Sequence, residues 1–469
     1  MNFPAHLKTL GLTFASIFLT ATASADPSIV RRIAFGSCAD QQKPCPIWGT
    51  IADYDPQWLL LLGDNIYADV VDGRLKPSTP ERIAAAYQQL GEMPEFNRLR
   101  ASTNIMATWD DHDYGNNDAG AQWEHKDAAA EIFHNFFGTP ADSPLRKQRG
   151  IYDARIVGPP GKRVQMIMLD TRYFRSELEK AERPLPGFRA RPYLQRTDPQ
   201  ATMLGDQQWK WLEQQLRQPA EIRLLCSSIQ VISDEHPFEK WDNFPAERQR
   251  LYDLIRDCEA SGVIILSGDR HRGEISLDPY SVGYALYDVT ASGLNQASRV
   301  WRPLEPNRHR VSSLEYGNHF GAIEIDWDRQ DPLISLQLRW EDGEIATQAR
   351  VLLSRLQAKP APKPLPAGVV SAGRALTLDV GDAAEVQFLV QAGRMFGERM
   401  RLLLNSESDY RSKRNFTVVM EATALSGPWG NIDLADLQGK TIRARGTIGV
   451  YNGVKQLVIE TPEQLQIVP

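Results

Sequence analysis

The sequence contains little cysteine or histidine and few long apolar runs. Only four cysteines and eight histidines occur among its 469 residues. Four cysteines in a chain of this length do not provide the dense disulfide framework that stabilises small secreted domains. After the N-terminal segment, no apolar run approaches the ~20 residues that cross a bilayer, so we expect no stable membrane insertion.

The sequence also lacks an excess of positive charge. It carries 53 lysines and arginines against 59 aspartates and glutamates, which gives a formal net charge of −6. A net acidic chain does not bind nucleic acid through its overall charge. An anionic substrate would therefore need a local cationic site, and a pair of metal ions can provide one.

The first residues have the organisation of a signal peptide. Lys8 precedes an apolar run at 10–19, and the small residues Ala-Ser-Ala at 23–25 form a cleavage signal. The alternative is an uncleaved N-terminal anchor, but the apolar run is shorter than a bilayer-spanning segment. We predict that the signal peptide 1–25 is removed on export and that the mature protein is periplasmic or secreted.

From Ile33 to about Ile275, strand-like runs alternate with helix-like patterns, which predicts an α/β fold with layered sheets in a domain of residues 26–357. The strand-like runs are strongly apolar, as expected where both faces of a sheet are covered, and occur at 31–38, 58–64, 104–111, 164–170, 223–232 and 263–269. Helical patterns fall at 80–90, 206–216 and 245–258. Shorter alternating runs at 284–293, 320–327, 333–340 and 346–354 predict antiparallel-leaning strands that complete this domain.

A Pro-rich segment at 358–369 separates this region from the last part of the chain. Such segments are semi-rigid spacers, so we place a linker here. Residues 370–469 contain strand-like runs and turns, and they resemble a small all-β barrel of the OB-fold type. OB folds hold oligonucleotides or oligosaccharides. This segment has few aromatic residues and no basic excess, so its ligand stays unknown.

Metal-competent residues follow four of the apolar runs. Cys38, Asp64, the cluster 110–112 and Asp269 each come where a predicted strand ends. In α/β sheets the ligand crevice lies beyond the carboxyl ends of the strands. A single aspartate after a strand is ordinary turn chemistry. Four such ends, with cysteine and histidine among them, predict a shared metal site.

The residue types in the first two runs suit a pair of metal ions. Asp64 follows Gly63, which permits a tight turn, and is the best candidate for a carboxylate that bridges two ions. Tyr67 lies three residues further on, and Cys38 would supply a thiolate. A phenolate and a thiolate together favour iron over an ion bound only by oxygen.

Two further clusters supply the remaining candidates. In an extended segment the side chains of 110–113 would alternate in direction, so one carboxylate can reach a metal while His112 faces the substrate. We assign catalytic roles to His112 and Asp113, with a carboxylate behind the imidazole to fix its tautomer. Asp269 and His271 lie two apart on a strand-like segment, so both can reach metals.

These clusters resemble the calcineurin-like metallophosphoesterase superfamily, and most closely its alkaline phosphatase D (PhoD-like) branch. The resemblance covers about residues 30–350 and includes five motifs in order. They are Ser37-Cys38, Gly63-Asp64-Asn65-Ile66-Tyr67-Ala68-Asp69, Trp109-Asp110-Asp111-His112-Asp113, Trp241-Asp242-Asn243-Phe244-Pro245-Ala246-Glu247-Arg248 and Gly268-Asp269-Arg270-His271.

The resemblance implies a layered β-sandwich flanked by helices and a two-metal site. By the resemblance, Asp64 bridges the metals, and His112 protonates the leaving oxygen after attack by a metal-bound hydroxide. An iron-like ion, Fe(3+), and a second ion, Ca(2+) or another divalent ion, are implied. The implied ligands are Cys38, Tyr67 and His271 for the iron-like ion, and Asp111 and Asp269 for the second ion.

The sequence departs from the superfamily pattern at its middle Gly-His motif. Residues 227–231 read Ser-Ser-Ile-Gln-Val, without a histidine, and His236 precedes a proline, so we give it no ligand role. His319 follows Gly-Asn but is discounted, because the cluster 110–113 already fills that motif. Asp170 and Arg172 are interpreted as an ion pair that supports the site.

If Cys38 is a metal ligand, only three cysteines remain for disulfide bonds. At most one intramolecular bridge can then form among Cys45, Cys226 and Cys258, and the sequence leaves its partners open.

We therefore predict an exported, two-metal phosphoric-ester hydrolase that acts on monoesters, diesters or both, in small or polymeric substrates. One alternative is a catalytically inactive binding or adaptor protein on the same scaffold, against which the intact ligand set argues. The other is a nuclease whose OB-like domain grips the strand, which the net charge of −6 does not favour.

Overall fold

The structure is a computed structural model, and the chain forms two compact units, Met1–Lys359 and Pro360–Pro469. The predicted signal peptide 1–25 and most of the predicted linker 358–369 lie outside the described residues. Across the described part of the chain, no helix is both long and apolar enough to cross a membrane. The described residues are 29–184, 191–298, 305–313, 315–357, 365–366, 368–396, 401–412, 415–430, 432, 434–451 and 453–468.

The first unit contains two six-stranded sheets. The first sheet has the order β14-β13-β12-β1-β2-β5. Strands β1, β2 and β5 run parallel, and β12, β13 and β14 add antiparallel neighbours. The strand bounds are β1 Arg32–Gly36, β2 Trp58–Leu62, β5 Asn104–Thr108, β12 His319–Asp326, β13 Leu333–Trp340 and β14 Ile345–Leu352.

The second sheet has the order β10-β11-β9-β8-β7-β6. Its four central strands run parallel and its two edge strands are antiparallel to their neighbours. The bounds are β6 Asp153–Val157, β7 Val164–Met168, β8 Ile222–Cys226, β9 Val263–Ser267, β10 Gly273–Asp278 and β11 Leu286–Ala291. A separate small hairpin joins β3 Val70–Val71 to β4 Arg74–Leu75.

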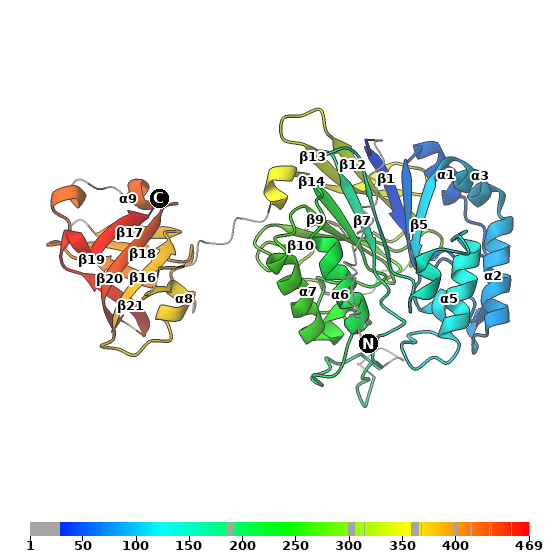
Figure 1. The fold of residues 1–469 in the computed structure, drawn as a ribbon, viewed down its shortest axis with the longest axis horizontal. Coiled ribbons are helices and arrows are strands. Elements are labelled where there is room, and N and C mark those ends of the chain that lie inside the picture. Colours follow the sequence, from blue (N-terminus) through cyan, green and yellow to red (C-terminus); the bar gives the residue numbers. More distant parts are fainter. Residues whose placement is uncertain are drawn as a thin grey trace, which may run out of the picture. The chain divides into compact units, whose positions relative to one another are not determined.

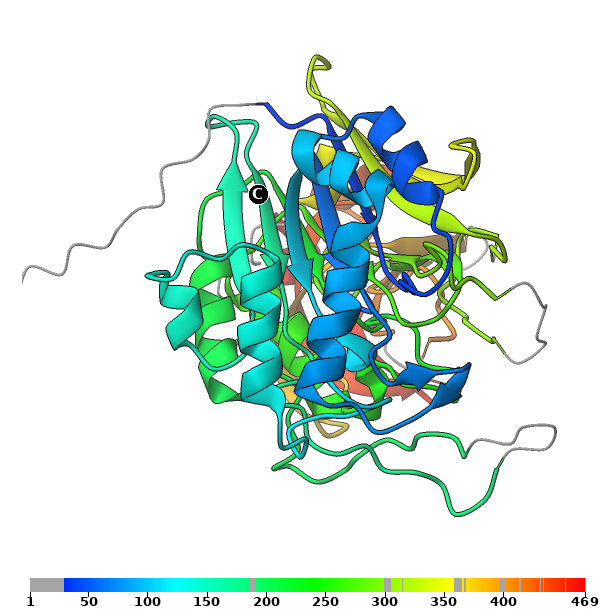
Figure 2. The same ribbon diagram turned by 90° about the vertical axis from the view of Figure 1, so that its right-hand side faces the viewer.

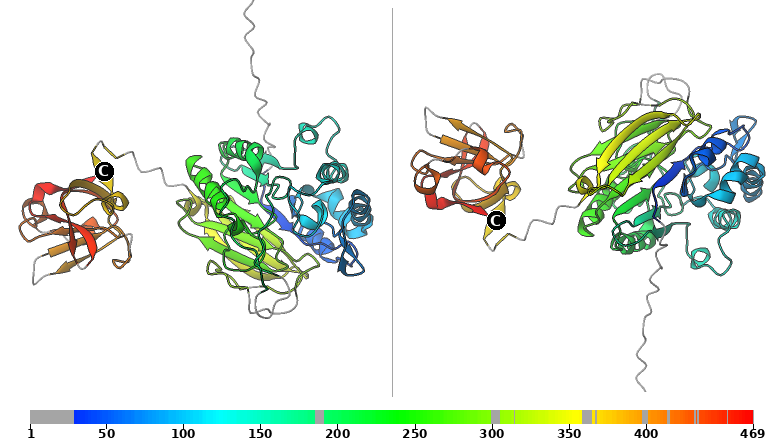
Figure 3. Two further views of the ribbon diagram at one scale, coloured as in Figure 1. Left: turned by 90° about the horizontal axis from the view of Figure 1, so that it is seen from below. Right: turned by 90° about the horizontal axis from the view of Figure 1, so that it is seen from above.

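Helices cover the outer faces of the two sheets (Figure 1). Helices α1, α2, α3 and α5 cover the first sheet, as Figure 2 shows, and α6 and α7 cover the second sheet on the opposite side, as Figure 3 shows. The bounds are α1 Ile47–Tyr54, α2 Pro80–Glu92, α3 Pro94–Ser102, α4 Asp111–Tyr114, α5 Lys126–Phe136, α6 Gly205–Leu216 and α7 Pro245–Asp257. Short 3₁₀ turns are η1 Pro144–Lys147, η2 Trp241–Asn243 and η3 Leu353–Leu356.

Helix α2 illustrates why these segments fold as they do. Thr79 caps its first turn by accepting a hydrogen bond from the Arg82 N–H, and Pro80 occupies the first helical position. Ile83, Ala86, Tyr87 and Leu90 recur at helical spacing and are buried against the sheet. The cap and the apolar stripe together fix where the helix begins and which face it buries.

The central strand β2 is buried on both faces. Trp58, Leu60 and Leu62 belong to the core between the two sheets, whereas Leu59 and Leu61 belong to the core beneath the helices of the first sheet. Successive side chains of a strand point to opposite faces, so one continuously apolar run serves both cores. This is the sandwich of helix-flanked sheets that the sequence predicts.

The second unit is rich in β-structure and has its own apolar core. Its sheet order is β15-β16-β20-β21-β19-β18-β17, and β22 also pairs with β20. The long strand β20 pairs with β16 and β22 through its first part and with β21 through its last part. The elements are β15 Val369–Ser371, α8 Ala372–Ala375, β16 Ala383–Leu389, β17 Ala392–Phe396, β18 Arg401–Asn405, β19 Thr417–Met420, η5 Gly427–Trp429, α9 Leu434–Leu437, β20 Thr441–Tyr451, β21 Val454–Ile459, η6 Pro462–Gln464 and β22 Leu465–Val468.

Two details differ from the sequence prediction. Strand β8 ends at Cys226 instead of continuing to Ile232, because the Ser227 side chain bonds to the Ile229 carbonyl and the chain turns. Strand β11 pairs in parallel with β9, whereas an antiparallel arrangement was expected for that region. The three strands β12, β13 and β14 do form the antiparallel arrangement.

Candidate metal centre

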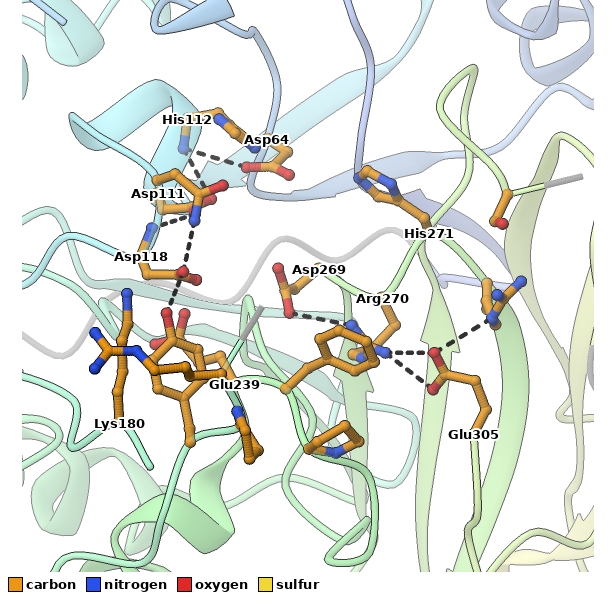
Figure 4. Close-up of a pocket in the computed structure, with 18 of the residues that line it drawn as sticks. Asp64, Asp111, His112, Asp118, Lys180, Glu239, Asp269, Arg270, His271 and Glu305 are labelled. Atoms are coloured by element: carbon orange, nitrogen blue, oxygen red, sulfur yellow. Dashed lines mark hydrogen bonds and ion pairs between the residues drawn. The ribbon is translucent and has the colours of Figure 1, made fainter. Parts of the chain in front are cut away.

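The carboxyl ends of strands from both sheets meet at one cavity. Asp64 follows β2, Asp111 and His112 follow β5, and Asp269 and His271 follow β9. All five line a cavity of about 740 Å³. Figure 4 shows their side chains around this pocket. The convergence predicted from the sequence is therefore present.

The backbone at this junction adopts an uncommon conformation. Cys38, Asp64, Asp269 and His271 have φ angles of 65°, 50°, 67° and 54°. Residues other than glycine rarely enter this left-handed region, and each such residue costs free energy that the surrounding structure must offset. Four of the predicted ligands share this feature, which turns their side chains out of the strand direction and into the crevice.

Two glycines allow the loops to approach closely. A Cβ on Gly63, where φ is 99°, would lie 2.5 Å from the Asp110 Cβ. A Cβ on Gly268 would lie 2.4 Å from the Ser37 Oγ. A side chain at either position would force its neighbours to shift, so glycine permits the loops after β1, β2, β5 and β9 to pack together.

The first donor group combines sulfur, phenol, imidazole and carboxylate. The Tyr67 hydroxyl lies 3.0 Å from the Asp64 Oδ2 and 3.0 Å from the His271 Nε2. The Cys38 thiol lies 3.4 Å from the same Asp64 oxygen. Ligand atoms of Cys38, Asp64 and His271 lie within 4.8 Å of one another. Burial, followed by the charge of His112, lowers the pKa of His271 to about 4, so its ring is neutral and able to ligate.

The second donor group consists of carboxylates. Asp110, Asp111 and Asp269 offer oxygens within 4.8 Å of one another, and Asp111 also groups with Asp64. The Asp110 Oδ1 accepts hydrogen bonds from Ser228 at 2.6 Å and from Arg172. Among the described residues, the Asp110 Oδ2 is buried and has no hydrogen-bond partner. Asp110 is therefore a further candidate ligand that the sequence analysis did not assign.

The two donor groups fit a pair of cations. Burial raises the pKa of Asp64 and of Asp269 well above the usual range, and the next largest cause that raises it is Cys38 for Asp64 and Asp110 for Asp269. Burial also raises the pKa of the Cys38 thiol to about 11. Bound cations reverse these effects, because they stabilise the ionised forms of the acids and of the thiol. A buried, unpartnered carboxylate oxygen in the same cluster agrees with this fit.

His112 is held by a carboxylate that the sequence analysis left without a role. Its Nδ1 lies 2.5 Å from the Asp69 Oδ1, and Asp69 is fixed in turn by the Asn117 N–H at 2.9 Å. Burial alone lowers the pKa of His112, but the charges of Asp111, Asp64 and Asp69 raise it well above its usual value. With Nδ1 bound to Asp69, the Nε2 is the ring nitrogen left for a substrate.

Asp113 does not lie behind the imidazole, which corrects the sequence analysis. Residues 111–114 form the helical turn α4 rather than an extended segment. The Asp113 Oδ1 accepts the Asp110 N–H at 2.5 Å, and its Oδ2 accepts the Asn65 amide at 2.6 Å and the Tyr87 hydroxyl at 3.3 Å. Asp113 therefore ties the loops after β2 and β5 together, below the site.

Asp269 and His271 also differ from the arrangement expected. They were placed on one face of a strand, but β9 ends at Ser267 and the two residues follow in a turn. As a result, His271 joins the donor group of Cys38, while Asp269 joins that of Asp111. Ser292 supports the first group, because its hydroxyl accepts the His271 N–H at 2.6 Å and lies 3.1 Å from the Cys38 thiol.

His236 and His319, which received no ligand role from the sequence, form hydrogen bonds outside the two donor groups. The His236 Nε2 lies 2.9 Å from the Gln230 Oε1. The His319 Nδ1 donates to the Gly317 carbonyl at 2.7 Å, and its Nε2 accepts the Ser292 N–H at 3.2 Å. Both rings are buried and act as structural links.

A buried ion network supports the second donor group. Arg172 pairs with Asp110 and, at 2.8 Å, with Glu239, which also faces Arg175 at 3.1 Å. The expected ion pair between Asp170 and Arg172 does not form. Asp170 instead accepts the Trp109 indole N–H at 2.8 Å and the backbone N–H of Arg172 at 2.9 Å.

All four cysteines are free thiols. Cys45 and Cys226 are buried and Cys258 is half-buried. The single bridge that the sequence allowed is not formed.

A comparison with protein-family models matches residues 33–332 to the PhoD-like phosphatase family. This match covers more than half of the chain and contains every predicted site residue. The chain belongs to the PhoD-like phosphatase family. The family assignment agrees with the resemblance carried by the five sequence motifs.

Individual known proteins are also similar to this PhoD-like chain. Alkaline phosphatase D of Bacillus subtilis (strain 168) is 25% identical over 186 residues, covering 35% of this chain and 30% of that protein. The matched part is thus about a third of the length of that curated relative. A solved structure of PhoD covers 70% of each chain, with a TM-score of 0.55 and 17% identity, and supports the fold. Purple acid phosphatase PPD1 from yellow lupin seeds covers 73% of this chain and 58% of its own at 12% identity, with a TM-score of 0.46.

Proposed function

We propose that this PhoD-like chain is a metal-dependent phosphoric-ester hydrolase that acts on monoesters, diesters or both. One observation carries the proposal. Asp64 of the first donor group also offers an oxygen within 4.8 Å of ligand atoms of Asp111, which belongs to the second group, and of His112. All three of these residues line the same cavity. A site of this kind can bind a phosphate between two cations while a neighbouring acid faces the leaving group.

The donor chemistry suggests which metals the two groups would hold. The group of Cys38, Tyr67 and His271 would hold a ferric ion, because thiolate and phenolate are suitable ligands for iron. The carboxylate group of Asp110, Asp111 and Asp269 would hold Ca²⁺ or another divalent ion, with Asp64 between the two. When bound, the ions would polarise the phosphate oxygens and lower the pKa of water.

The protein's own residues would bind the leaving group and move one proton. Asp69 accepts the His112 Nδ1 proton and fixes the ring, so the Nε2 carries the proton that faces the cavity. The ring also packs against Tyr67, with ring centroids 4.3 Å apart, which limits its rotation. We assign His112 as the general acid that protonates the leaving oxygen, and Asp69 as its positioning residue.

We also propose that the chain acts outside the cytoplasm, in the periplasm or as a secreted protein. The signal-peptide pattern of residues 1–25 supports this location. The second unit is proposed to be an OB-like module, because its long strand β20 is shared between two groups of strands. Its ligand is not assigned.

The direct test compares hydrolysis of p-nitrophenyl phosphate and bis(p-nitrophenyl) phosphate by the metal-loaded chain. His112→Ala and Asp64→Ala should each lower kcat by at least about 100-fold, because they remove the acid and the shared ligand. His309→Ala, which does not line the cavity, is the matched control and should keep the wild-type rate. The proposal fails if the folded, metal-loaded wild type cleaves neither ester.

The metal assignment has a separate spectroscopic test. A phenolate and a thiolate on ferric iron give charge-transfer absorption in the visible range. Tyr67→Phe should shift or remove this band while the iron remains measurable. A colourless, iron-free chain with full activity would contradict the roles given to Cys38 and Tyr67.

A further inference from the structure

An arm of two antiparallel segments forms one wall of the cavity. We define the arm as residues 177–184 and 191–196. An isolated bridge pairs Lys180 with Tyr193. Hydrogen bonds join the Ala181 N–H to the Pro192 carbonyl at 2.9 Å and the Leu194 N–H to the Glu179 carbonyl at 2.8 Å. Tyr193 docks the arm, because its N–H donates to the Pro237 carbonyl at 2.9 Å and its hydroxyl donates to Asp118.

Among the described residues, four lysine and arginine side chains line the cavity, and the arm carries two of them, Lys180 and Arg191. The other two, Arg270 and Arg272, lie 2.8 Å and 3.5 Å from the carboxylate of Glu305. Lys180 and Arg191 are exposed, and within the described residues neither has a carboxylate at ion-pair distance. Figure 4 shows Lys180 on the same side of the pocket as Asp118.

Lys180 and Arg191, the two arm cations, differ from two buried arginines of this protein, which have a carboxylate partner. Arg172 and Arg175 are fully buried, and both face Glu239. A cation that only stabilises the fold is expected to have such a partner. Lys180 lies over the Tyr193 ring, 5.2 Å from its centroid, but neither it nor Arg191 has a carboxylate partner among the described residues. Two such cations on the wall of the cavity raise its potential where an anion can reach them.

The arm cations also face a second cavity. This cavity, of about 900 Å³, shares Asn117, Asp118, Lys180, Arg191 and Tyr193 with the metal-site cavity. The two cavities therefore adjoin each other along the arm. Cavities of several hundred Å³ accommodate ligands much larger than a single phosphate group.

We propose that Lys180 and Arg191 form a subsite for a second phosphate group of the substrate, distinct from the phosphate that is hydrolysed. This inference rests on the proposed function for the position of the scissile phosphate. The guanidinium of Arg191 can bind a phosphate through two hydrogen bonds, and the ammonium of Lys180 adds a point charge. The preferred substrates are then esters that carry a further phosphate on their distal part.

The test measures binding rather than turnover. Alkane bisphosphonates with about two to six carbons between the phosphorus atoms are titrated calorimetrically into the full, metal-loaded chain, beside alkylphosphonates of equal length. Carbon–phosphorus bonds resist a phosphoesterase, and the series covers different spacings. For the best spacing, the wild type should bind the bisphosphonate about tenfold more tightly than the alkylphosphonate, because each of two exposed charge interactions adds a small gain in affinity.

The variant Lys180→Gln/Arg191→Gln should lose this advantage and keep its affinity for the alkylphosphonate. The control Lys147→Gln/Arg329→Gln removes the same charge from exposed positions outside both cavities and should keep the advantage. The inference is overturned if the wild type shows no advantage at any spacing, or if the arm variant keeps it. If the metal-loaded chain hydrolyses no ester, the proposed function is contradicted. The comparison of bisphosphonate and alkylphosphonate binding still tests the second-phosphate subsite by itself.

Discussion

Asp69 and Asp113 are both buried near His112, yet they contact different groups. Asp69 meets the imidazole, whereas Asp113 meets backbone N–H groups, an amide and a phenol. A carboxylate that orients a ring affects the reaction, and a carboxylate that accepts several structural hydrogen bonds affects folding. Substitution of each by asparagine separates the two roles, because the side-chain size stays nearly constant.

Asp69→Asn should lower kcat by about 10- to 100-fold, with little change in KM or metal content. The amide lacks the charge that stabilises a protonated His112 and can favour the wrong tautomer. Steady-state kinetics on bis(p-nitrophenyl) phosphate, together with metal analysis of the same preparation, measure both effects. An unchanged kcat would exclude Asp69 as the positioning residue.

Asp113→Asn should lower the free energy of unfolding by about 3 kcal/mol, because the new amide nitrogen faces donors that previously met an acceptor. Urea titration followed by circular dichroism measures this change. Asp328→Asn, at an exposed position, is the matched control and should change the free energy of unfolding by less than about 0.5 kcal/mol. Equal stabilities of the two variants would contradict the structural role.

The sequence predicts the metal-competent residues better than it predicts their neighbours. Asp64 and Asp269 could be assigned because they follow apolar strands and belong to recognisable motifs. The partner of His112 could not, because the sequence analysis treated 110–113 as extended. The helical turn α4 directs Asp113 back to the Asp110 N–H and leaves Asp69, which is distant in sequence, to reach the imidazole.

At the scale of elements, the close packing of the loops after β2 and β5 depends on Gly63. Gly63→Ala combines a positive φ with a Cβ 2.5 Å from that of Asp110, whereas Gly73 has a φ of 70° and open space around it. Gly73→Ala should cost about 1 kcal/mol of unfolding free energy. Gly63→Ala should cost at least about 2 kcal/mol more, because the loop must move. Urea titrations of both variants give the difference, and equal costs would contradict the close-approach argument.

The elements themselves were predicted where burial leaves a clear pattern. Strands β2 and β9 are fully buried apolar runs, and α2 has a cap and an apolar stripe. The parallel pairing of β11 with β9 was not predicted, because pairing between strands depends on contacts distant in sequence. The early end of β8 was also missed, since Ile229, Val231 and Ile232 are buried in a loop and continue the apolar pattern beyond the strand.

At the scale of the whole molecule, the two units have separate apolar cores. Every candidate metal ligand, the proposed general acid His112 and its positioning residue Asp69 lie in the first unit. A chain ending at Gln357 should therefore hydrolyse p-nitrophenyl esters with kcat/KM within about threefold of the full chain, because it keeps both apolar cores of the first unit. Kinetics on both chains at equal metal loading measure this. A folded, metal-loaded short chain without activity would place part of the site in the second unit.

The measurement that tests the central claim most directly is metal reconstitution of the full chain. Metal is removed with a chelator and then returned in known equivalents, while hydrolysis of bis(p-nitrophenyl) phosphate and bound metal are followed together. We expect no activity without metal and full activity only after two ions are bound per chain. His271→Ala and Asp269→Ala should each bind one ion fewer, because their side chains belong to different donor groups. Undiminished hydrolysis by the metal-free chain, or full activity with one bound ion, would contradict a two-metal centre.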